Sequence, residues 1–165
     1  MRRHTLIGFA AAVTVAAIFV GEAGAAATRA VKTYAVHATL DAQHVVTPAN
    51  KRWTPPAGVR AARGSFAGRL SVSSGSRSLE WKVSYADVGV GRLPIVDIHL
   101  GRPGHFGQLL VRLCAPCTSG RHGTKKLTAA AVRAITSGEA WVTLISERFP
   151  NGVIRGQISA NPSNE

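Results

Sequence analysis

The chain contains few cysteines, few aromatic residues and few acidic residues. Its 165 residues include 2 Cys, 6% aromatic residues, and 8 Asp and Glu against 20 Lys and Arg. Two cysteines are too few for a disulfide-stapled mini-protein or a four-thiolate zinc site. The length suits one domain, and the 45% share of apolar residues is typical of a globular protein rather than of a disordered basic tail.

Familiar catalytic motifs are also missing from the sequence. It has no Gly-x-Ser-x-Gly, no phosphate-binding Gly-rich loop ending in Lys-Ser or Lys-Thr, and no His-Glu-x-x-His. Its few carboxylates show no pairing typical of a glycosidase. We therefore expect a protein that is not an enzyme.

Residues 1–25 have the pattern of a secretory signal peptide. A short basic start is followed by an uncharged apolar run over residues 6–20 and then by small residues, with cleavage expected after Ala25. The apolar run is shorter than the ~20 residues of a spanning helix, which argues against an uncleaved anchor. The pattern predicts a secreted or extracytoplasmic protein (periplasm, cell wall or medium) with no transmembrane segment after signal cleavage.

Positive charge is spread along the expected mature chain. Removal of residues 1–25 takes away Arg2, Arg3 and Glu22, which changes the formal charge from +12 to +11. A domain this cationic is attracted to anionic surfaces. There is no basic run longer than a pair such as Lys125-Lys126 and no interleaved aromatic platform, so a nucleic-acid partner is not expected. An anionic envelope component or a protein is the expected partner, and the pattern indicates no particular oligomeric state.

Most of the mature chain alternates between apolar and polar residues with the period of a β-strand. The clearest case is a hairpin formed by residues 66–72 and 79–85 around a Ser/Gly turn. Further strands are predicted at residues 34–40, 96–100, 109–113, 141–146 and 153–158. One short helix is predicted over residues 129–136, with Thr128 as its N-cap.

About seven short strands and one helix predict an all-β sandwich or barrel. The expected organisation is a signal peptide (1–25), a linker (26–33), a β-sandwich domain (34–160) and a disordered tail (161–165).

Two motifs, in this order, identify a resemblance to a known family. One is the strand Val96-Asp97-Ile98-His99-Leu100-Gly101, followed by a Gly-rich turn and a second apolar strand. The other is Gly152-Val153-Ile154-Arg155-Gly156-Gln157, after a Trp-Val strand and a Pro-containing turn. From about Tyr34 to Ala160 the chain resembles the CHRD (chordin-type) domain, which is common in exported bacterial proteins. The positions that carry the resemblance are Ile98, His99, Gly101, Gly107, Gly152, Ile154, Arg155, Gly156 and Gln157.

The resemblance implies an immunoglobulin-like β-barrel, distantly similar to copper/zinc superoxide dismutases, and no established general activity. The sequence departs from the family pattern at three places. The family's His-Ile-His is Asp97-Ile98-His99 here, its Asn-x-His-Thr is Thr143-Leu144-Ile145-Ser146, and its last Glu is Val153. Two histidines that would be candidate ligands are therefore absent.

Asp97 and His99 are the candidate metal ligands. Residues two apart on a strand share a face, so both side chains are expected opposite the apolar residues of this strand. A histidine and a carboxylate suit zinc, copper or iron, and His105 is the nearest third ligand in sequence. The favoured alternative is structural, with Asp97 paired to an arginine such as Arg155 and His99 half-exposed. No cofactor is expected, apart from a transition metal if Asp97 and His99 are metal ligands.

Cys114-Ala115-Pro116-Cys117 has the spacing of a thioredoxin-type motif. A redox pair usually opens a helix, whereas these cysteines are predicted to end a strand and enter a turn. We therefore expect a structural disulfide in an oxidising compartment.

Three functions follow in order of preference. The first is a non-catalytic binding or structural module at the cell envelope, with a cationic surface that favours anionic partners. The second is metal binding through Asp97 and His99. The third is thiol–disulfide chemistry through Cys114 and Cys117.

Overall fold

Nine strands and one short helix form within residues 30–89 and 94–163, the part of the chain that the computed structural model describes. The predicted signal peptide (1–25) lies outside the described residues. The helix α1 spans Ala129–Thr136, and two 3-10 turns, η1 (Ala42–His44) and η2 (Ala57–Val59), lie between the first two strands. The strands are β1 (Lys32–Asp41), β2 (Arg63–Val72), β3 (Arg77–Ala86), β4 (Ile95–Leu100), β5 (Leu109–Cys114), β6 (His122–Lys126), β7 (Ala140–Ser146), β8 (Phe149–Gln157) and β9 (Ser159–Ser163).

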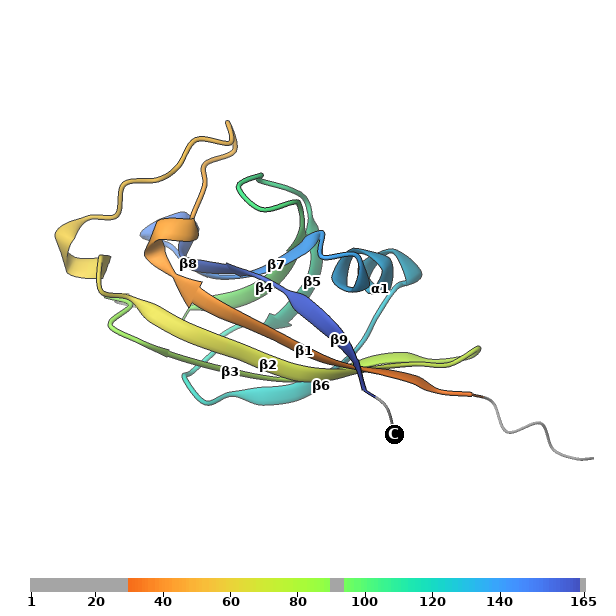
Figure 1. Cartoon of the computed structure of the whole chain (residues 1–165). Coiled ribbons are helices and arrows are strands. Elements are labelled where there is room, and N and C mark those ends of the chain that lie inside the picture. The colour runs from red at the N-terminus through yellow and green to blue at the C-terminus, as the bar shows by residue number, and fades with distance from the viewer. Residues whose placement is uncertain (1–29, 90–93, 164–165) are drawn as a thin grey trace, which may run out of the picture.

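All nine strands belong to one antiparallel sheet. Its order is β5-β4-β7-β8-β1-β2-β3-β6, and β9 pairs with β1 beside this path. The sheet curves into two layers, with β1, β2, β3 and β6 along the bottom of Figure 1 and β4, β5, β7 and β8 above them. The architecture is therefore the all-β, barrel-like sandwich that the alternating pattern predicts.

The predicted hairpin is the most regular part of the sheet. β2 and β3 pair over ten residues, from Arg63↔Ala86 to Val72↔Arg77, and β1 pairs with β2 over ten more. Alternate residues of these strands face the core between the layers, where Leu40, Phe66 and Leu79 are each at most 1% exposed. Burial of these apolar side chains, at about 25 cal/mol per Å² of apolar surface, stabilises the two-layer arrangement.

Two strands lie where the sequence predicted none, so nine strands replace the expected seven. β6 pairs with β3 and β9 pairs with β1, so residues 161–163 of the expected disordered tail (161–165) lie in a strand. β1 also begins at Lys32, inside the expected linker 26–33. Neither β6 nor β9 alternates between apolar and polar residues. Backbone hydrogen bonds to a long neighbouring strand hold these segments in place, so they need no buried apolar face.

The helix α1 has the predicted bounds and cap. Thr128 Oγ1 accepts a hydrogen bond from the Ala131 amide at 3.1 Å, and Gly138 follows the helix with φ +74°. Ala131, Ala134 and Ile135 face the core, so α1 packs against one end of the sandwich (Figure 1). Among the described residues, no helix has the length and apolar character needed to cross a membrane.

The upper layer is buried on both sides. Along β4, residues 96–99 are all buried, and six of the seven residues of β7 are buried. Asp97 and His99 share a face as predicted, but they are only 2% and 9% exposed, so the expected half-exposed His99 is wrong. The turn between β4 and β5 covers this face, which a local alternating pattern cannot reveal.

Candidate functional site

The outer face of the upper layer brings the family motif residues together. Strand register aligns two rows of side chains across β5, β4, β7 and β8. The first row is Arg112, Asp97, Thr143 and Arg155, and the second is Leu109, His99, Trp141 and Gln157. We call the residues Asp97, His99, Trp141, Thr143, Arg155 and Gln157 the motif face.

Asp97 is held by Arg112 from the neighbouring strand. Arg112 Nε lies 3.1 Å from Asp97 Oδ1, and its Nη2 lies 3.2 Å from Oδ2, which is a two-pronged ion pair. The hydrogen bond with Asp97 raises the pKa of Arg112. The predicted pairing of Asp97 with an arginine is confirmed, but the partner is Arg112 and not Arg155, which lies two strands away with Thr143 between them in the row.

His99 is buried and is held through one of its ring nitrogens. Its Nδ1 lies 3.0 Å from the carbonyl oxygen of Gly107, which can only accept, so Nδ1 carries the proton. The ring stacks on Trp141 with centroids 4.4 Å apart and planes 13° apart. Burial lowers the pKa of His99, and the hydrogen bond to Gly107 only partly opposes that effect. Nε2 is buried and has no hydrogen-bond partner among the described residues.

Arg155 is a buried cation between the sheet and the 101–108 turn. It is 3% exposed, its Nη2 donates to the His105 carbonyl at 2.7 Å, and its Cζ lies 3.7 Å from the centre of the Trp141 ring. Burial lowers the pKa of Arg155 to about 10. Its Nη1 is buried without a hydrogen-bond partner in the described part of the chain.

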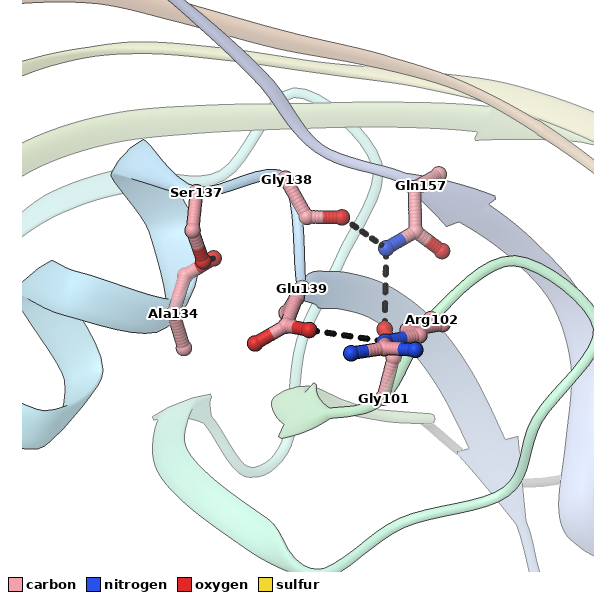
Figure 2. Close-up of polar contacts among 7 residues, drawn as sticks. All are labelled: Gly101, Arg102, Ala134, Ser137, Gly138, Glu139 and Gln157. Carbon is pink, nitrogen blue, oxygen red and sulfur yellow. Dashed lines mark hydrogen bonds and ion pairs between the residues drawn. The ribbon is translucent and has the colours of Figure 1, made fainter.

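Gln157 ties the same turn to the end of α1. Its Nε2 donates to the Gly101 carbonyl at 2.9 Å and to the Gly138 carbonyl at 2.8 Å, so one amide joins two segments. Figure 2 shows this amide between the two carbonyls, with the ion pair from Arg102 Nε to Glu139 Oε1 (2.8 Å) beside it. Together these contacts fix where the 101–108 turn leaves β4.

Two motif glycines are required by close backbone approach. A Cβ on Gly107 would collide with the carbonyl group of Leu100, and a Cβ on Gly156 would collide with that of Thr39. Only glycine therefore allows the 101–108 turn to fold back on β4, and only glycine lets β8 approach β1 this closely.

The arrangement agrees with a family comparison. A family model described as the CHRD domain matches residues 36–158. The chain belongs to the CHRD domain family. No curated protein and no solved structure matched the chain in the corresponding searches.

The motif residues of this CHRD domain serve mainly to hold one turn. His99, Arg155 and Gln157 bond to the backbone carbonyls of Gly107, His105 and Gly101, all of which lie in the 101–108 turn. The sequence motifs identify these residues but not Arg112, the partner of Asp97. The only local signal was an arginine inside the otherwise apolar run from Leu109 to Leu113, and the irregular β4–β5 register hides which residue it faces.

The structure does not bring the three proposed metal ligands together. Asp97 is occupied by Arg112, His99 uses Nδ1 for a backbone carbonyl, and the exposed His105 contributes only its carbonyl oxygen to Arg155. Within residues 30–89 and 94–163, no three His, Cys, Asp or Glu side chains are grouped so that they could hold a metal ion.

Cys114 and Cys117 form a disulfide bond at the end of β5. Cys117 is fully buried, its amide donates to the Pro94 carbonyl at 2.7 Å, and its carbonyl accepts from the Tyr85 hydroxyl at 2.6 Å. The pair ends a strand and enters a turn, as predicted, and does not open a helix. A disulfide is compatible with a location outside the cytoplasm.

Proposed function

We propose that this CHRD protein is exported and acts as a non-catalytic binding or structural module at the cell envelope, where its cationic surface favours anionic partners. The observation that carries this proposal is the charge of the described residues. They include sixteen Lys and Arg against six Asp and Glu, a formal charge of +10. Of the sixteen cations, only Arg155 is buried.

The six acidic residues in the described part of the chain offset only part of this charge. Asp97 is buried against Arg112, while Arg102 pairs with Glu139 at 2.8 Å. The surface therefore has a net positive electrostatic potential. This potential attracts polyanions, and the attraction weakens as salt screens it.

A non-catalytic role is supported by the state of the motif face. Its polar groups form hydrogen bonds to the turn that covers them. They therefore stabilise the fold, whereas the polar groups of an active site would be accessible to a substrate. The disulfide between Cys114 and Cys117 supports action outside the cytoplasm.

Retention on an anionic cell-wall preparation tests the electrostatic part. We expect binding at ~0.15 M salt and release at ~1 M, because the screening length falls from about 8 Å to about 3 Å. Equal retention at both salt concentrations would contradict it. Sequencing of the mature N-terminus tests export separately, with Ala26 expected as the first residue, and an intact Met1 in the exported fraction would contradict the signal-peptide assignment.

A further inference from the structure

A hydrophilic surface lies on the opposite side of the molecule from the motif face. It is the outer face of β1, β2, β3 and β6, the lower layer in Figure 1. The long strands β1, β2 and β3 pair there without a bulge, so their outward side chains form straight rows. Its exposed residues, which we call the basic sheet face, are Ala35, His37, Thr39, Ser65, Ala67, Arg69, Glu80, Lys82, His122, Thr124 and Lys126.

The composition of the basic sheet face favours a polar, acidic ligand. None of its exposed residues is aromatic or a large aliphatic, and the nearest ring, that of Trp81, is only 5% exposed. The face therefore lacks the exposed apolar centre of a protein interface and the exposed stacking rings of a neutral-sugar site. Most of its uncharged residues are Ala, Ser or Thr, whose short side chains leave the surface accessible to a ligand. Its three cations, Arg69, Lys82 and Lys126, face a single carboxylate, Glu80, which lies directly opposite Arg69 in the register.

A hollow of about 440 Å³ lies in the middle of this face. It is lined by Ala67, Gly68, Glu80, Trp81, Lys82, His122, Gly123 and Thr124. Lys82 on β3 and His122 on β6 are register partners, which places their Cβ atoms about 5 Å apart at its rim. Within the described residues, neither side chain makes a hydrogen bond or ion pair, so both are free to bind a ligand.

We infer that the basic sheet face binds an extended acidic polysaccharide. Lys82 and His122 hold one carboxylate at the hollow, and Lys126, four residues along β6 and therefore about 13 Å away, contacts another. The hydroxyls of Ser65 and Thr124 are placed to bond sugar hydroxyls. This inference rests on the anionic partner of the proposed function, and it adds the surface and the chemical class.

The test measures binding of the full mature protein to three polymers at ~0.15 M salt. Alginate carries carboxylates and hydroxyls, dextran carries hydroxyls alone, and polyphosphate carries charge without sugar. We expect alginate to bind at least about ten-fold more tightly than either of the others. Equally tight binding of polyphosphate would overturn the polysaccharide assignment, because charge alone would then account for the binding. Equal binding of dextran would overturn the role of the cations.

Matched variants test the surface. Lys82→Gln/Lys126→Gln should weaken alginate binding about ten-fold. Lys51→Gln/Arg60→Gln removes the same charge from two exposed positions of the 42–62 connection and should weaken binding less than two-fold. Ala67→Gln fills the hollow at constant charge and should also weaken binding. All four substituted cations are exposed, so the fold should survive, which the unfolding temperature checks.

The outcomes separate the two proposals. If both double variants lose the same affinity, the basic sheet face is not the site, while the proposed attraction to anionic partners stands. If the unsubstituted protein binds neither alginate nor polyphosphate, the anionic partner itself is wrong and the inference falls with it.

Discussion

The guanidinium of Arg155 lies on the indole of Trp141, with Cζ 3.7 Å from the ring centre. A buried arginine in this position combines a cation–π contact with a hydrogen bond to the His105 carbonyl. Lysine keeps the charge but not the planar fork, so the two residues are not equivalent here. The cation–π contact joins β8 to β7, and the hydrogen bond joins β8 to the 101–108 turn.

Arg155→Lys should lower the free energy of unfolding by about 2–3 kcal/mol, because the His105 carbonyl and the indole face lose their partner. Urea denaturation measures this loss. Arg148→Lys is the matched control, since Arg148 lies over the Phe149 ring at 5.4 Å but is exposed. It should change stability by less than about 0.5 kcal/mol. Equal losses in both variants would show that burial of Arg155 is not the cause.

The lowered pKa of His99 predicts a loss of stability in acid. Below pH ~6.5 the unfolded chain binds a proton at this residue while the folded protein, with its lowered pKa, does not. The free energy of unfolding should therefore fall as pH drops through this range, by at most about 1.4 kcal/mol per pH unit. The nearby charges are Asp97, which raises this pKa, and Arg155 and Arg112, which lower it.

Urea denaturation between pH 7.5 and 5 measures this slope. His99→Gln should be less stable at pH 7.5 but should show a flatter pH dependence, because the titrating group is gone. His122→Gln, at an exposed position, should keep the slope of the unsubstituted protein. An unchanged slope in His99→Gln would assign the acid sensitivity to another group.

Gln157→Glu should destabilise the protein because a carboxylate replaces the donor that faces two carbonyls. Loss of the hydrogen bonds to Gly101 and Gly138 should cost about 2–3 kcal/mol at pH 7. Part of the loss should be recovered at acidic pH, where a protonated Glu can donate to one carbonyl. Gln108→Glu, on the exposed part of the same turn, should have little effect in thermal denaturation. An equally large loss of stability in Gln108→Glu would show that the added negative charge, and not the loss of the two hydrogen bonds, is the cause.

Gly107→Ala should cost at least about 3 kcal/mol or prevent folding, because the new Cβ meets the Leu100 carbonyl and the backbone cannot yield without breaking the β4 turn. Gly58→Ala is the control, since a Cβ there would have no atom within 4 Å apart from those of its chain neighbours and its own helical turn. It should be neutral within about 0.5 kcal/mol. Circular dichroism and thermal unfolding measure both variants. A neutral Gly107→Ala would refute the close approach.

Cys114→Ala/Cys117→Ala should lower stability by only about 2 kcal/mol, because the disulfide closes a loop with a sequence separation of 3. The fully buried Cys117 also predicts no cysteine-dependent insulin reduction. Denaturation with and without reductant measures the first effect. A cysteine-dependent reduction rate would restore the thiol–disulfide function.

Local pattern was enough to predict the strand hairpin, the helix and the family. The hairpin of β2 and β3 follows from period-two alternation around a Ser/Gly turn, and α1 follows from Thr128 before an Ala-rich run. These features depend on residues close together in the chain. The edge strands β6 and β9 escaped prediction because their pairing depends on a distant partner, β3 or β1.

The residue types on the motif face were also readable, but their partners were not. The motif placed His99, Arg155 and Gln157 in strands, yet each bonds to a carbonyl of a turn that folds back over them. Asp97 pairs with Arg112 because β5 lies beside β4, a neighbour relation set by the sheet order. Composition thus accounts for the charge, and local sequence pattern for the β-class and the family. The burial and the partners of each polar group are decided by the tertiary structure, because they depend on strands and a turn that are remote in sequence and adjacent in space.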